Sequence, residues 1–131
     1  MREILFRGRS IDTGEWLCGD LTHHGDNDNR AQIWYLDEDG ERYNAMVYLH
    51  TVGQFTGLTD KNGEKIFEGD IIARKRGMTT AAIMWDDCRK QFMAKETGGR
   101  ENDIDFYFPH DGKTIEDAEI IGDIYERGAE L

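Results

Sequence analysis

Short runs that are either apolar or alternately apolar and polar fill most of the chain, and long helical periodicity is hard to find. Glycine, aspartate and asparagine, which are typical of tight turns, bound these runs. The pattern predicts strands at 4–6, 15–21, 32–36, 42–48, 52–58, 66–73, 80–85, 91–94, 105–108 and 118–126. One helical turn is predicted at 114–117, where Thr114 is an acceptable N-cap. The sequence therefore predicts a mainly β protein with little helix.

Two tight turns separate neighbouring strands. The stretch Asp37–Glu41 contains an Asp-Gly pair, and Thr59–Lys65 is centred on an Asn-Gly pair. Both pairs accept the positive φ that a hairpin turn requires. We therefore expect Gly63, like Gly53, Gly57 and Gly69, to serve the backbone rather than a binding site. The expected core contains bulky apolar residues of the strands: Leu5, Phe6, Trp16, Leu17, Ile33, Val52, Phe55, Ile71, Ile83, Trp85, Phe92, Ile121 and Ile124.

The length of 131 residues suits one domain, or two small lobes that share a core. A soft boundary near 50–66 divides the chain into an N-terminal β lobe, 1–60, and a C-terminal lobe, 61–131. Short strands joined by turns, as in the second lobe, usually close into a small barrel or roll. We therefore expect a small N-terminal sheet followed by a small β-barrel.

The charge is strongly negative and uneven. The formal net charge is −11, with −6 in residues 1–60, +3 in 61–100 and −8 in 101–131. This balance favours solubility and repels nucleic acid and anionic membranes at long range. The basic middle indicates either a binding face or internal ion pairs.

The cysteine and hydropathy patterns predict a cytoplasmic location. Cys18 and Cys88 are far apart, which favours two reduced thiols. The start, MREILFRG, carries charges where a signal peptide has its apolar core. No run approaches the ~20 apolar residues that a membrane helix requires.

The segment 51–72, TVGQFTGLTDKNGEKIFEGDII, resembles the hallmark segment of the YopX family. The opening 1–8 and the closing 119–126, EIIGDIYE, also resemble that family, so the resemblance spans the chain in order. It implies a protein encoded by a phage or prophage in a bacterial host. It also implies an SH3-like barrel in the C-terminal lobe and homo-oligomers. It carries over no catalytic residue and no cofactor, and the molecular role of the family is not established.

Metal-binding patterns are weak. Cys18, His23, His24 and His50 lack the close pairing of zinc ligands. The stretch that starts at Asp60 begins like a calcium loop, but a lysine stands where that loop requires glycine. We therefore expect no metal.

Catalytic patterns are equally weak. Ser10 is the only serine, and it lacks the context of a nucleophile elbow. Cys88 follows Asp86 and Asp87, whose charges would raise the pKa of its thiol and blunt its reactivity. We therefore expect a protein that is not an enzyme and holds no cofactor.

Two functions remain. The favoured one is a protein-interaction module that binds a host or phage protein, with DNA mimicry as a specific form and salt-sensitive binding to a basic partner as its consequence. The alternative is a small-barrel nucleic-acid-binding protein. In that case Arg74, Lys75 and Arg76 would contact phosphates, and Trp85 or Phe92 would stack on bases.

Overall fold

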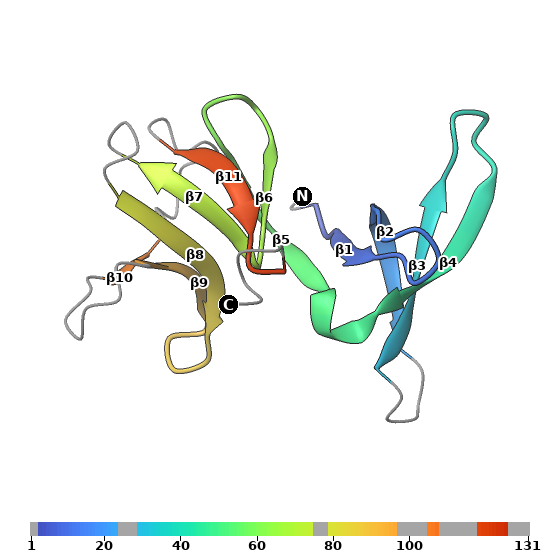
Figure 1. The fold of residues 1–131 in the computed structure, drawn as a ribbon, viewed down its shortest axis with the longest axis horizontal. Helices are drawn as coiled ribbons and strands as arrows, with labels where there is room; N and C mark the ends of the chain where they lie inside the picture. The colour runs from blue at the N-terminus through green and yellow to red at the C-terminus, as the bar shows by residue number, and fades with distance from the viewer. Residues whose placement is uncertain (1–2, 24–28, 75–78, 97–104, 108–117, 126–131) are drawn as a thin grey trace. The chain divides into compact units, whose positions relative to one another are not determined.

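The computed structural model describes residues 3–23, 29–74, 79–96, 105–107 and 118–125. Within these ranges the regular elements are strands and one short 3-10 helix, η1 (Leu49–Thr51) (Figure 1). The mainly β fold predicted from the alternation is therefore confirmed. The helical turn predicted at 114–117 lies outside the described residues.

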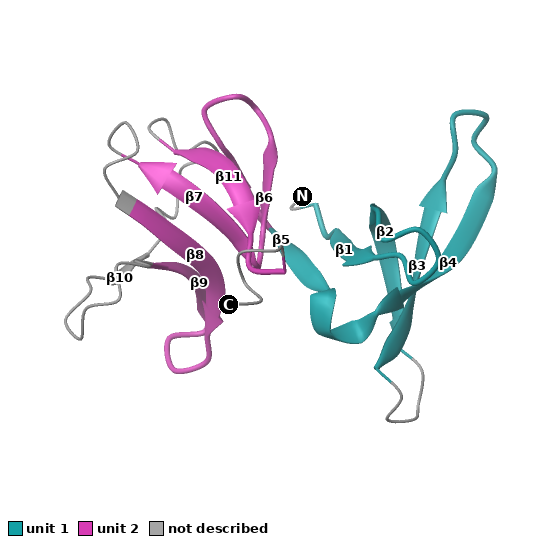
Figure 2. Cartoon of the chain, in the orientation of Figure 1, with its two compact units in different colours: residues 1–55 teal, residues 56–131 magenta. Residues whose placement is uncertain are grey.

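The chain divides into two compact units, Met1–Phe55 (unit 1) and Thr56–Leu131 (unit 2) (Figure 2). The boundary predicted from the sequence follows residue 60, five residues later. Strand β5 (Gly53–Thr59) runs across the division. Its first residues pair with the first strand of unit 1, and its later residues belong to unit 2.

Unit 1 is an antiparallel meander that curls back on itself. Its strands are β1 (Phe6–Arg9), β2 (Trp16–His23), β3 (Arg30–Leu36) and β4 (Arg42–Tyr48). Each strand pairs with the next, and an isolated bridge joins Ser10, just after β1, to Val47 of β4. The Ile11 amide also donates to the Met46 carbonyl at 3.0 Å. The end of β1 therefore meets β4, and the four strands enclose the small core of this unit.

Thr51 connects β1 to η1 in unit 1. Its side chain is buried, its Oγ1 donates to the Tyr48 carbonyl at 2.6 Å, and the same oxygen accepts from the Arg9 amide at 2.9 Å. A hydroxyl can donate and accept at once, so one side chain serves both backbone segments.

Unit 2 contains a five-stranded antiparallel sheet. A meander of β7 (Asp70–Arg74), β8 (Thr79–Asp86), β9 (Gln91–Glu96) and β10 (Asp105–Tyr107) is extended by β11 (Glu119–Asp123), which returns beside β7. No pairing among the described strands joins the edge strands β10 and β11. The closed SH3-like barrel that the resemblance implies therefore stays a prediction.

The hallmark segment forms the hairpin of β5 and β6 (Lys65–Phe67) and the approach to β7. Gly69 lies in this approach with φ +95°, and a Cβ there would lie 2.9 Å from the Tyr125 ring. Its amide donates to the Ile83 carbonyl, and its carbonyl accepts from the Ile124 amide. Only glycine allows both this backbone conformation and this close approach, so the structural role predicted for Gly69 is confirmed.

Each unit has its own apolar cluster. In unit 1, Phe6, Leu17, Leu21, Leu49 and Val52 pack against the buried residues Ala31, Ile33 and Val47. In unit 2, Ile120 packs against Leu58, Ile66, Ile72, Ala81, Ile83, Ala94 and Ala118. The predicted core residues Phe6, Leu17, Ile33, Val52 and Ile83 are therefore confirmed. Phe55 is also buried.

Three core predictions are wrong, because Trp85, Ile121 and Ile124 are 41%, 53% and 39% exposed. Trp85 is the last apolar residue before the β8–β9 turn, so it lies beyond the covered part of the sheet. Ile121 is the extra residue of a β-bulge between the pairs Ile120–Ile72 and Gly122–Ile71. Ile120 packs against the core, so its neighbour Ile121 belongs to the opposite, exposed face of the strand. Ile124 follows the end of β11.

Candidate interaction surface

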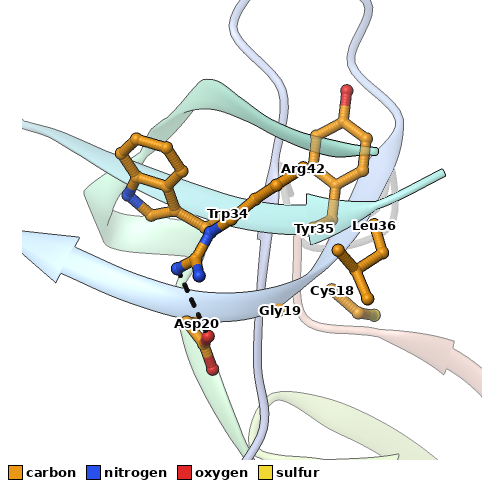
Figure 3. Close-up of a pocket in the computed structure, with 7 residues that line it drawn as sticks. All are labelled: Cys18, Gly19, Asp20, Trp34, Tyr35, Leu36 and Arg42. Atoms are coloured by element: carbon orange, nitrogen blue, oxygen red, sulfur yellow. Dashed lines mark ion pairs between the residues drawn. The ribbon is translucent and has the colours of Figure 1, made fainter. Parts of the chain in front are cut away.

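A hollow of about 330 Å³ opens on β2, β3 and β4 of unit 1 (Figure 3). We call it the Trp34 hollow, and its lining consists of Cys18, Gly19, Asp20, Trp34, Tyr35, Leu36 and Arg42. Its volume lies at the lower end of the ~300–1,000 Å³ typical of ligand sites. Tryptophan, tyrosine and arginine are the residues that dominate the energetics of protein interfaces. The composition therefore fits a small recognition site.

Three contacts orient the side chains at the centre of the hollow. The Trp34 indole Nε1 donates to Thr22 Oγ1 at 3.1 Å, which holds the ring against β2. The Arg42 guanidinium carbon lies 5.2 Å from the centre of that ring, within the range of a cation–π contact. Arg42 Nη2 lies 3.7 Å from Asp20 Oδ2, the ion pair that is dashed in Figure 3.

The Arg42–Asp20 pair is exposed and easily opened. Its two side chains are 60% and 75% exposed, and 3.7 Å is longer than a hydrogen bond. Exposed ion pairs contribute about 0–1 kcal/mol to stability. A charged ligand that binds to Arg42 or to Asp20 therefore has to separate this ion pair, which costs at most about 1 kcal/mol.

Gly19 brings the walls of the hollow together. β2 pairs with β1 through Trp16–Gly19 and with β3 from Asp20 onward, so it changes partners at this point. A Cβ at residue 19 would lie 1.9 Å from the Trp34 carbonyl oxygen. The absent side chain therefore allows β3 to lie close to β2 at Trp34, the last residue of β3 that pairs with β2.

Apolar side chains remain open to solvent beside these charges. Leu36, which pairs with Arg42, is 68% exposed, whereas Tyr43, which pairs with Tyr35 on the opposite face, is 48% exposed with ring centres 6.1 Å apart. The run Ile33–Leu36 buries Ile33 in the core of unit 1, so its alternate residues Trp34 and Leu36 belong to the other face. Large side chains on that face are free to contact a partner.

A second tryptophan in unit 1 also lies under guanidinium groups. The guanidinium carbons of Arg7 and Arg9 lie 4.1 and 4.6 Å from the centre of the Trp16 ring. Arg7 is buried, and Arg9 Nη1 donates to the Gly14 carbonyl at 2.8 Å. This cluster is more enclosed than the pair at Trp34, so we assign it to the stability of unit 1.

The residues predicted for nucleic-acid contact are only partly placed. Arg74 is half-buried at the end of β7, opposite Thr79 at the start of β8. Lys75 and Arg76 lie outside the described residues.

The aromatic pair of that alternative, Trp85 and Phe92, lies at the other end of β8. Its rings meet edge to face with centres 5.0 Å apart, and the Trp85 Nε1 donates to Asp87 Oδ1. Trp85 lies six positions after Thr79 along the strand, which is about 20 Å. The structure therefore does not bring Arg74 next to the aromatic pair.

Among the described residues, no group of three or more histidine, cysteine, aspartate or glutamate side chains is placed to hold a metal ion. Cys18 and Cys88 are exposed and form no disulfide. The Asp60 carboxylate accepts from the amides of Asn62, Glu64 and Ile120. A hairpin turn therefore accounts for the calcium-like pattern that begins at Asp60.

Sequence reasoning missed the residues of the Trp34 hollow. Ile33–Leu36 is a continuous apolar run, but Ala45–Leu49 and Ala81–Trp85 are longer runs of the same kind, so this signal does not single out the hollow. Such a run indicates a strand that is covered on both faces or that offers one face to a partner. Asp20 and Arg42 reach the hollow only through the pairing of β2, β3 and β4, which composition does not reveal.

None of the described segments forms a helix of the length and apolarity that crossing a membrane requires.

Comparison with known proteins defines the family. No curated protein matches the sequence. The model of the family described as YopX protein matches residues 5–131, nearly the full length. The chain therefore belongs to the YopX protein family.

Proposed function

We propose that this protein is a non-enzymatic protein-interaction module, encoded by a phage or prophage and active in the bacterial cytoplasm, and that the Trp34 hollow is its recognition site. The observation that carries the proposal is the hollow itself. It combines an oriented tryptophan, an exposed leucine and an exposed, displaceable ion pair on one sheet of unit 1. Aromatic and guanidinium groups supply most of the binding energy in many protein interfaces.

The role assigned to unit 2 is that of a scaffold with an SH3-like fold. Its strand order places the last strand, β11, beside the first strand of the meander, β7. Closure of β10 toward β11 would remove two open edges, which is how small barrels avoid pairing with other chains. The family resemblance and this strand order support the barrel.

The Trp34 hollow is tested by affinity capture with a matched tryptophan control. Tagged protein is incubated with lysate of a bacterial host treated with nuclease, and bound proteins are identified by mass spectrometry. Trp34→Ala should lose the partner because it removes the platform of the hollow. Trp85→Ala, which removes an exposed tryptophan of unit 2, should retain it. Thermal unfolding of both variants confirms that each is folded.

Two results would overturn the assignment. Capture that Trp85→Ala abolishes and Trp34→Ala retains would move the recognition site to unit 2. Recovery that depends on intact nucleic acid would instead favour the nucleic-acid-binding alternative and direct attention to Arg74.

A further inference from the structure

Several acidic residues lie next to the Trp34 hollow in the sequence and in its lining. The turn between β3 and β4 joins Leu36 to Arg42, two lining residues, and carries Asp37, Glu38, Asp39 and Glu41. Asp20 adds a carboxylate within the hollow, where Arg42 is the one cation of the lining. Field lines from such a cluster attract cations and repel anions. The partner that complements this site is therefore cationic.

Arg42 shows how a cation fits the hollow. Its guanidinium group lies over the Trp34 ring and faces Asp20, so it satisfies a cation–π contact and an ion pair together. An arginine from another protein could make the same two contacts, because the resident pair is long and exposed. Its methylene stem would pack on exposed apolar surface such as that of Leu36.

We propose that the Trp34 hollow receives an arginine side chain of a basic protein segment, which replaces Arg42 over Trp34 and pairs with Asp20. This inference rests on the proposed function and names the chemistry of the partner. A nucleic acid does not fit the same site, because its phosphates would meet the carboxylates of the turn 37–41. The net charge of −11 adds long-range attraction for a basic partner.

A peptide titration followed by NMR tests this proposal. The probe is a five-residue blocked peptide, Gly-Ser-Arg-Ser-Gly, and its control contains citrulline, the neutral isostere of arginine. The chain has three tryptophans, so three indole N–H signals report on Trp16, Trp34 and Trp85. The spectrum of Trp34→Phe assigns the signal of interest. We expect the arginine peptide to shift the Trp34 signal and the citrulline peptide to leave it in place.

Two variants of the resident pair give effects of opposite sign. Arg42→Gln removes the internal competitor and should tighten binding of the arginine peptide about threefold, the size expected for one exposed ion pair. Asp20→Asn removes the acceptor and should weaken binding by a similar factor. A merely structural role for the pair would weaken binding in both variants. Arg89→Gln, which removes an exposed arginine of unit 2, is the matched control and should change nothing.

The outcomes separate this inference from the proposed function. Equal shifts with the citrulline peptide, weaker binding by Arg42→Gln, or binding that high salt leaves unchanged would overturn the arginine-binding site. A shift of the Trp34 signal by oligothymidine instead of the arginine peptide would also overturn it. The interaction module would still stand if Trp34→Ala abolished capture of the partner from lysate.

Discussion

Buried carboxylates in unit 2 serve as acceptors for the backbone. Asp60, Asp70 and Asp123 are each nearly inaccessible to solvent. Asp70 accepts from the Phe67 amide at 2.7 Å, and Asp123 accepts from the Tyr125 amide at 2.8 Å. Such charge-assisted bonds are stronger than neutral ones and offset the cost of burying the charge. Two of these residues, Asp60 and Asp70, lie in the hallmark segment, so that segment is explained by folding rather than by chemistry.

Asp60 offers the clearest test of this interpretation. One carboxylate oxygen accepts from two amides of the β5–β6 turn, and the other accepts from the Ile120 amide at 3.0 Å. Asp60→Ala would leave buried donors without acceptors, so we expect a loss of about 3 kcal/mol in the free energy of unfolding. Urea denaturation measures this loss.

The control for Asp60→Ala is Asp39→Ala, which removes an exposed carboxylate from the other Gly-containing turn. It should change the free energy of unfolding by less than about 0.5 kcal/mol. Equal stability of the two variants would show that Asp60 does not hold β11 to the turn.

At the level of elements, β2 is the strand that shapes the Trp34 hollow. Its first half pairs with β1 and its second half with β3, and the change occurs between Gly19 and Asp20. This change of partner lies at the hollow, because Gly19 and Asp20 of β2 line it together with Arg42 of β4. The geometry of the site is therefore a property of strand pairing.

Gly19→Ala tests the close approach of β3 to β2 directly. The added Cβ would overlap the Trp34 carbonyl, a backbone atom that cannot rotate away, so we expect a loss of about 2 kcal/mol in stability. We also expect a displaced Trp34 indole signal in the NMR spectrum. Gly14→Ala is the control because a Cβ there meets open space. Its cost should be limited to the strain of its positive φ, about 1 kcal/mol. A Gly19→Ala variant as stable as wild type would contradict the close approach.

Local sequence predicted the strands better than it predicted what each strand faces. The Asp-Gly pair before Arg42 forms the predicted turn, in which the Asp37 amide donates to the Glu41 carbonyl. By contrast, the apolar pair Ile120 and Ile121 does not tell which of the two faces the core, and it is Ile120 that packs there while Ile121 is exposed. Turn chemistry is local, whereas burial depends on neighbours that are distant in the sequence.

For the whole molecule, charge and family were accessible from the sequence, but the site was not. The resemblance of segment 51–72 led to the YopX family, which the match over residues 5–131 confirms. The basic stretch that includes Arg74 could be predicted as a candidate nucleic-acid contact because its charges are consecutive in the sequence. Asp20, Trp34 and Arg42 are far apart along the chain, and three strands bring them together. Pairing of β2, β3 and β4 had to be known before they could be recognised as one site.

The placement of the two cysteines gives the molecule a built-in reporter. Cys18 lines the Trp34 hollow in unit 1, and Cys88 lies in the β8–β9 turn of unit 2, both exposed. A maleimide should alkylate both thiols in the free protein. Saturation with the arginine peptide should slow the reaction at Cys18 and leave Cys88 as an internal reference, as peptide mapping by mass spectrometry would show. An unchanged ratio of the two alkylation rates would show that the peptide binds elsewhere. Because both cysteines are native, occupancy of the hollow can be measured by thiol footprinting without any mutation.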